Sequence, residues 1–200
     1  MFSAALTTET RMGGHLGEVI ARAATLPGET VARTVLELVE LAPSDAVLEL
    51  GCGSGRLLAT VAARLRRGFA AGIDPSALMV RHARMRNRRW IAQGRAEVSA
   101  GRSDDLGRFA DARFDKVYGT HVVYFWVEPA RDLAEIRRVL RPGGALVLGF
   151  FPSEDGTAGA TRFPVERAVR LLGQAGFTDV RAERRAAGRH ALAWLKGVRS

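Results

Sequence analysis

Cysteine and lysine are scarce in this chain of 200 residues: Cys52 is the one cysteine, and Lys116 and Lys196 are the two lysines. A single cysteine cannot form an internal disulfide, which is typical of a reducing compartment, so we expect a cytoplasmic protein. No apolar run approaches the ~20 residues of a membrane-spanning helix. The first residues also lack the basic and apolar regions of a signal peptide. No Cys/His cluster has metal-ligand spacing, so we expect no metal site.

The charge is strongly basic, with a formal net charge of +9, and arginine provides almost all of it. Such a bias often reflects a GC-rich genome, although a basic protein can also bind nucleic acid or anionic surfaces. We interpret the densest basic cluster as a solvated helix face, and nucleic acid as a possible but unfavoured partner. The cluster comprises Arg81, His82, Arg84, Arg86, Arg88, Arg89 and Arg95.

The length suggests one domain, and the order of apolar patterns predicts its class. Two helical patterns, over 15–24 and 28–41, come first. Strands then alternate with helices, which implies a doubly wound, mostly parallel sheet covered on both faces. The predicted helices are 54–67, 76–93, 129–140 and 165–175. The predicted strands are 46–50, 69–73, 96–100, 115–119, 145–151, 180–183 and 191–195. The segment 141–144, which contains one proline and two glycines, predicts a turn that separates the helix 129–140 from the fifth strand.

A glycine-rich loop, Gly51-Cys52-Gly53-Ser54-Gly55, follows the first predicted strand and opens a helix. Ligands of such sheets bind at the carboxyl ends of the strands, and glycines there allow a ligand to approach the backbone. The spacing is G-x-G-x-G rather than the dinucleotide fingerprint G-x-G-x-x-G, because Arg56 holds the place of the last glycine. Glu49 would lie poorly beside a pyrophosphate and suits a cofactor with a cationic amino group and a sulfonium.

Asp74 ends the second predicted strand, 23 residues after Gly51. An acid at this place can accept hydrogen bonds from both ribose hydroxyls of a nucleoside. The alternative is that Asp74 caps the following helix, but Ser76 is already placed to do so. We therefore predict ribose binding by Asp74.

Four segments in the right order resemble the class I S-adenosylmethionine-dependent methyltransferases. VLELGCGSG, starting at Val47, resembles the first motif of the family, and GIDPS, starting at Gly72, resembles its ribose-binding motif. The segments 114–126 and 135–148 resemble the fourth strand and the helix, turn and fifth strand. The resemblance covers roughly 42–151. Within the family, the chain looks most like the small-molecule branch similar to ubiquinone- and menaquinone-biosynthesis methyltransferases. It implies a Rossmann-like methyltransferase domain over 42–200, preceded by a helical lid segment over 1–41.

The resemblance also implies which residues hold S-adenosyl-L-methionine. The loop would surround the methionine portion, Asp74 would bind the ribose, and the start of the next helix would flank the adenine. Relatives commonly have an acid where Arg102 stands, so Ser103 or Asp104 is expected to replace that contact. The cofactor-binding residues predicted are Glu49, Gly51, Cys52, Gly53, Gly55, Asp74, Pro75, Ser76, Met79, Arg102, Ser103, Thr120 and His121.

His121 follows the fourth predicted strand, where the cofactor of the family meets its substrate. It is our candidate catalytic residue, as a general base or an orienting group for the acceptor. The alternative is a histidine that is hydrogen-bonded in the pocket without taking part in chemistry. Tyr124, Phe125 and Trp126 either line the acceptor pocket or are packing residues.

The sequence thus predicts methyl transfer to a small-molecule acceptor by direct displacement. Two alternatives stay open, an RNA methyltransferase and a noncatalytic protein that binds S-adenosylmethionine. The acceptor, the type of methylation and the oligomeric state are not determined by these patterns.

Overall fold

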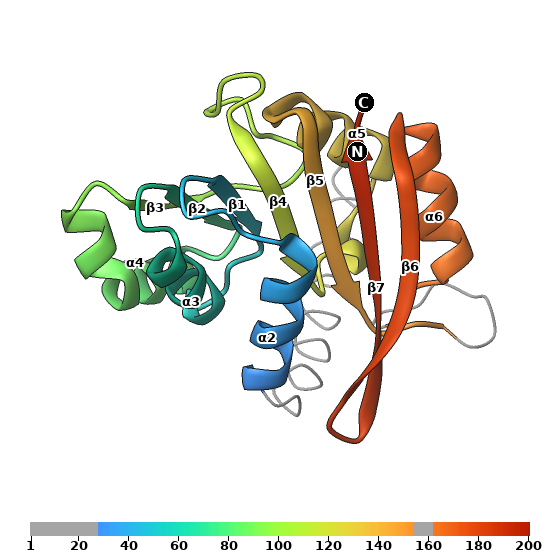
Figure 1. Cartoon of the computed structure of the whole chain (residues 1–200), viewed down its shortest axis with the longest axis horizontal. Helices are drawn as coiled ribbons and strands as arrows, with labels where there is room; N and C mark the ends of the chain where they lie inside the picture. Colours follow the sequence, from blue (N-terminus) through green and yellow to red (C-terminus); the bar gives the residue numbers. More distant parts are fainter. Residues whose placement is uncertain (1–27, 154–161) are drawn as a thin grey trace, which may run out of the picture.

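A seven-stranded sheet forms the centre of the molecule in a computed structural model that describes residues 28–153 and 162–200. The strand order is β3-β2-β1-β4-β5-β7-β6 (Figure 1). The strands from β1 to β5 pair in parallel, while β7 pairs antiparallel with both β5 and β6. The prediction of a doubly wound, mostly parallel sheet is confirmed. Its order reverses between β1 and β4, which is where such sheets bind ligands.

The parallel strands are largely buried, as expected where helices cover both faces of a sheet. Four of the five residues of the first strand and five of the six residues of the second are buried. The bounds are β1 Ala46–Leu50, β2 Phe69–Asp74, β3 Ala96–Ala100, β4 Phe114–Thr120 and β5 Leu140–Phe150.

The fifth strand begins earlier than predicted, because the segment 141–144 does not break it. Leu140 pairs with Phe114, and the register shifts before Ala145 pairs with Lys116. Gly143 has a φ of +76°, which accommodates the extra residues of this irregular pairing. Proline and glycine therefore mark an irregularity inside β5 rather than its start.

The last two strands are also longer than predicted. The strand β6 covers Phe177–Ala187 and β7 covers His190–Arg199, against predictions of 180–183 and 191–195. Most of β6 is exposed, so it has no continuous apolar pattern. Its length comes from backbone pairing with β7, and Gly188, with a φ of +64°, forms the turn between them.

Helices cover both faces of the sheet (Figure 1). On one face, α2 (Gly28–Val39), α3 (Arg56–Arg64) and α4 (Ala77–Ala92) bury apolar side chains against Val47, Tyr118 and Val147. On the other face, α5 (Pro129–Val139) and α6 (Val165–Gln174) bury apolar side chains in the same cluster as Leu48 and Leu148. The helix predicted over 15–24 lies outside the described residues. None of the helices in the described ranges has the length and apolar character that crossing a membrane requires.

Candidate cofactor and acceptor site

The carboxyl ends of the parallel strands bring the predicted site residues to one edge of the sheet. Leu50 pairs with both Ile73 and Gly119, so the glycine loop lies between the ends of β2 and β4. Asp74 pairs with Ala100, and Thr120 with Gly149. Segments far apart in the sequence therefore meet where the predicted site requires them.

The three loop glycines have left-handed backbone angles, with φ of +61° at Gly51, +52° at Gly53 and +72° at Gly55. A Cβ atom at Gly51 would lie 2.7 Å from a Val122 methyl carbon, and one at Gly55 would lie 2.5 Å from Asn87 Nδ2. These two glycines thus allow close approach of neighbouring protein atoms. At Gly53, by contrast, a Cβ atom would meet nothing within 4 Å. The middle of the loop faces open space, as a backbone that receives a ligand must.

Asp74 connects this loop to the next helix. Its Oδ2 accepts from the amide of Gly53 at 2.8 Å, and its Oδ1 accepts from the amide of Ser76 at 2.9 Å. The Ser76 hydroxyl in turn accepts from the amide of Met79, so Ser76 caps α4 as predicted. Each carboxylate oxygen has a second lone pair, so the two amide contacts leave acceptor capacity for ribose hydroxyls.

The helix α4 also holds the loop by two side chains that the sequence analysis missed. Asn87 is fully buried, and its Nδ2 donates to the carbonyl of Gly55 at 3.0 Å. Arg86 Nε donates to the carbonyl of Ser54 at 2.9 Å. The signal for Asn87 was available, because it follows Val80 and Ala83 at helical spacing on the buried side of α4. A lone amide on an apolar stripe indicates a fixed hydrogen-bond partner.

Glu49 lies beneath the loop, only 4% exposed, and accepts from the hydroxyl of Tyr118 at 3.1 Å. Burial is the main cause that raises its pKa to about 8; the Tyr118 hydroxyl opposes this shift, and the nearby Asp74 carboxylate adds to it. The carboxyl group is therefore largely protonated at neutral pH in this form of the protein. A cation bound nearby would favour its ionised form.

Cys52 and the start of α4 complete the cofactor residues predicted on this side. The Cys52 thiol is buried, and burial raises its pKa well above the usual range, so it stays a neutral thiol. Its amide donates to the carbonyl of Ile73 at 2.9 Å. Pro75 is exposed and Met79 is partly exposed at the first turn of α4, directly beside Asp74.

The loop after β3 is fixed by side-chain contacts. Arg102 pairs with Asp104 at 3.2 Å, and the Ser103 hydroxyl donates to Asp132 on α5. Asp132 is 3% exposed, and burial raises its pKa to about 6 despite the Ser103 hydrogen bond. Sequence reasoning missed Asp132, because only the tertiary structure brings α5 to this loop.

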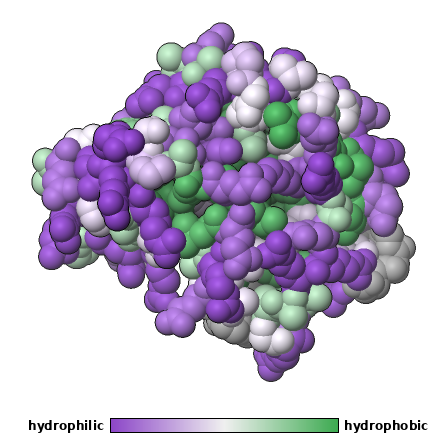
Figure 2. All heavy atoms as spheres, in the orientation of Figure 1, coloured by the Kyte–Doolittle hydropathy of each residue, from purple (hydrophilic) through white to green (hydrophobic). Residues whose placement is uncertain are grey.

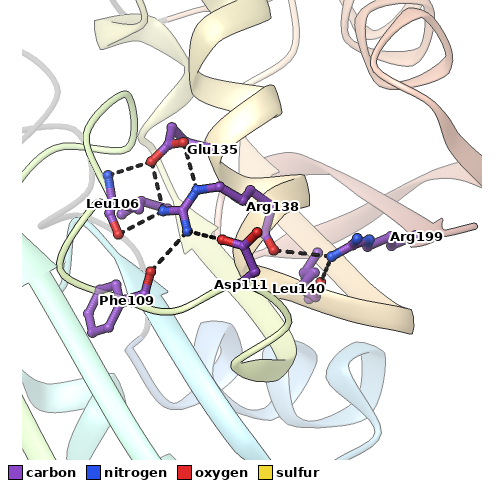
Figure 3. Close-up of polar contacts among 7 residues, drawn as sticks. All are labelled: Leu106, Phe109, Asp111, Glu135, Arg138, Leu140 and Arg199. Carbon is purple, nitrogen blue, oxygen red and sulfur yellow. Dashed lines mark hydrogen bonds and ion pairs between the residues drawn. The ribbon is translucent and has the colours of Figure 1, made fainter.

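Arg138 at the end of α5 secures the remainder of the same loop (Figure 3). Its guanidinium donates to the carbonyls of Leu106 and Phe109 and forms ion pairs with Asp111 and Glu135. These carboxylates raise the pKa of Arg138 above its usual range. The loop that borders the site is thereby attached to the helix behind the sheet.

Aromatic side chains surround His121 at the end of β4. Its ring centroid lies 4.8 Å from that of Phe151, and its Nδ1 lies 3.4 Å from the Tyr124 hydroxyl. His121 has a φ of +60°, uncommon for a residue with a side chain, and its amide donates to the carbonyl of Gly149. Thr120 precedes it and is partly exposed. The end of β4 thus holds a buried imidazole, 8% exposed, and a partly exposed phenol near each other.

Known sequences agree with this arrangement. The model of a family described as methyltransferase domain matches residues 48–148. A putative methyltransferase of Bacillus subtilis, YrhH, is 30% identical over 79% of this chain and 82% of its own length. The O-methyltransferase cnsE of Penicillium expansum is 30% identical over 64% of this chain, and the trans-aconitate 2-methyltransferase of Azoarcus is 32% identical over 58%. The chain spans 45% and 43% of the lengths of these last two relatives.

Solved structures share the fold. The [4+2]-cyclase SpnF matches with a TM-score of 0.71 and 20% identity over 85% of this chain and 80% of its own. A geranyl diphosphate methyltransferase in complex with S-adenosylmethionine matches with a TM-score of 0.69 and 15% identity, over 86% and 85%. Because these identities are low, the two structures support the fold alone. The family match and the glycine-loop site together identify the chain as a member of the methyltransferase domain family, an S-adenosylmethionine-dependent methyltransferase.

Proposed function

We propose that this enzyme transfers a methyl group to a small-molecule acceptor that binds beside His121. The observations that carry the proposal are the open space at Gly53 and, at the neighbouring end of β4, the contacts of His121 with Tyr124 and Phe151. A ring or short chain can bind between a cofactor on the glycine loop and the side chains at this strand end. The names of two relatives, an O-methyltransferase and a trans-aconitate 2-methyltransferase, support acceptors of this size.

The residues present fit S-adenosylmethionine. In this proposal Gly51, Gly53 and Gly55 admit its methionine portion, Glu49 faces the amino group, and Asp74 binds the ribose. Cys52, Pro75, Ser76, Met79, Arg102, Ser103 and Thr120 complete the surroundings. When bound, the cofactor supplies an electrophilic methyl group on a sulfonium.

The protein's own contribution is then positioning. The loop and Asp74 hold one reactant, while His121 and Tyr124 orient the acceptor, and such alignment is worth several kcal/mol. His121 Nδ1 lies near the Tyr124 hydroxyl, which itself accepts from the amide of Phe151 at 2.5 Å. This network fixes the imidazole so that it can accept a proton from an acidic acceptor group.

Calorimetric titration tests the cofactor half of the proposal. We expect S-adenosylmethionine to bind in the micromolar range and NADH to bind far more weakly. Gly53→Ala should retain the fold, at a cost of about 1 kcal/mol for the left-handed backbone, and lose binding because its Cβ occupies the open space. Asp74→Asn should weaken binding at least tenfold. Unchanged affinity in a folded Gly53→Ala variant would contradict the placement of the ligand.

Product formation tests the acceptor half. Release of S-adenosylhomocysteine is measured with a panel of small carboxylic acids, phenols and amines, and separately with total RNA. We expect turnover with a member of the small-molecule panel and a fall of about 10²-fold or more in His121→Ala. Turnover with RNA alone would favour the RNA methyltransferase, and cofactor binding with no turnover in any assay would favour a noncatalytic binding protein.

A further inference from the structure

The positive charge of the chain is concentrated in one short stretch. Residues 56–96 contain ten arginines and a single acid, Asp74, so this stretch alone has a net charge of +9. The remaining residues contain 20 basic and 20 acidic side chains and are balanced. A general preference for arginine over lysine explains the type of residue but not this placement.

This basic stretch forms one end of the molecule. It covers α3 and α4, which pack against each other at the β3 side of the sheet, on the left of Figure 1. Figure 2, in the same orientation, shows mostly hydrophilic side chains over that end. Asp74 is buried and bonded to backbone amides, so it does not offset the arginines at the surface.

The outward face of α4 combines charge with apolar side chains. Leu78, Arg81, His82, Met85 and Arg89 recur at helical spacing and are all exposed. Leu78 is 46% exposed and Met85 is 61% exposed, and they are two of the three large apolar side chains exposed among the described residues. The helix contains no acid at all, so none of its arginines gains an i,i+4 ion pair. A helix surface that serves only for solubility typically mixes both signs.

We propose that this face, which we define as Leu78, Arg81, His82, Met85, Arg88 and Arg89, docks on an anionic phospholipid bilayer. Guanidinium groups bind lipid phosphates, and the two apolar side chains between them can enter the boundary between headgroups and acyl chains. Nucleic acid fits less well, because the face exposes no Phe, Tyr or Trp ring for base stacking. Trp90 is partly buried, with the guanidinium carbons of Arg89 and Arg95 at 4.9 and 4.8 Å from its ring centroid.

Docking in this way would bring the reaction site close to the membrane. The first turn of α4 follows Asp74 and Ser76 directly, and Leu78 lies at the same end of the helix. The proposal itself depends on the surface and not on the identity of the acceptor. It can therefore succeed or fail independently of the proposed function.

Co-sedimentation with vesicles tests the proposal on the full chain. One set of vesicles is phosphatidylcholine alone, and the other has equal parts of phosphatidylcholine and phosphatidylglycerol. We expect binding to the anionic vesicles only, weakening as salt rises from about 0.1 to about 0.5 M. The triple variant Arg81→Gln, Arg88→Gln, Arg89→Gln should bind about a hundredfold more weakly, at about fivefold per arginine.

Two further variants separate this proposal from a general charge effect and from nucleic-acid binding. Arg33→Gln, Arg170→Gln, Arg181→Gln removes the same charge from exposed positions elsewhere, and we expect less than a threefold change. Leu78→Gln, Met85→Gln keeps every arginine, and we expect at least a fivefold loss of vesicle binding with no loss of S-adenosylmethionine binding. Equal binding by both triple variants overturns the proposal, as does tight binding of single-stranded RNA with none to anionic vesicles.

Discussion

Glu49 illustrates how its surroundings determine the charge of a single residue. The folded protein holds its proton up to a pKa of about 8, whereas an unfolded chain releases it near the ordinary value of 4.5. Between these values the folded state binds more protons than the unfolded state. The contribution of Glu49 to stability therefore decreases as the pH rises from about 4.5 to about 8.

Replacing this residue should remove that part of the pH dependence. In Glu49→Gln we expect the fall in unfolding free energy between pH 5.5 and 8 to be smaller by on the order of 2 kcal/mol, because glutamine does not titrate. Urea unfolding of the wild type and the variant at pH 5.5 and pH 8 measures this change in unfolding free energy. The exposed Glu29→Gln serves as control and should keep the wild-type slope; the same slope in Glu49→Gln would contradict the assigned burial effect.

Asn87 gives a second prediction at this scale. Asn87→Ala leaves the carbonyl of Gly55 without its side-chain donor in a buried place, which should cost about 1–3 kcal/mol. The exposed Arg86→Gln, which removes the donor to Ser54, should cost less than about 0.5 kcal/mol. Thermal unfolding compares the two. Similar losses in both variants would show that Asn87 does not fix the loop.

At the scale of elements, Arg138 determines how α5 holds the loop after β3. Arg138→Gln removes two ion pairs and two hydrogen bonds to backbone carbonyls, and we expect a loss of about 1–3 kcal/mol. Amide hydrogen exchange should accelerate most over 104–111, since that segment loses its attachment. Faster exchange spread evenly over the whole sheet, with no excess in that segment, would argue against this role.

The ends of the elements show which features local patterns predict. The strands 46–50 and 96–100 were predicted with the bounds observed, because glycine or other turn residues flank both segments closely. The extent of β6 was not predictable, because its exposed residues gain their conformation from pairing with β7. The start of β5 was predicted wrongly for a related reason: Leu140 already pairs with β4, and this pairing resumes at Ala145 after the proline and the glycines.

For the whole molecule, one sheet joins the two core clusters. Leu58 belongs to the cluster under α3, and Leu148 to the cluster under α5, on opposite faces. We expect Leu58→Ala and Leu148→Ala each to cost about 2–5 kcal/mol and to lower the midpoint of a single transition. Far-ultraviolet circular dichroism and tryptophan fluorescence, followed on heating, should coincide. Two separated transitions would show that the faces unfold independently.

The sequence by itself determined the class of fold and indicated the cofactor and the residues that we propose to hold it. Glycine spacing, the acid that ends the second strand and the alternation of strands and helices are local patterns, and each follows from backbone geometry along a few residues. The same patterns placed Gly53, Asp74 and His121 at strand ends that the structure brings to one edge of the sheet.

Only the tertiary structure decided what surrounds these residues. The support of the loop by Asn87, the bond of Ser103 to Asp132 and the burial that keeps Glu49 protonated all join segments distant in the chain. The packing of α3 against α4 also decides that the basic stretch 56–96 gathers at one end of the molecule. Hydrogen-bond partners and desolvation depend on distances across the fold, and these are not encoded in any local pattern.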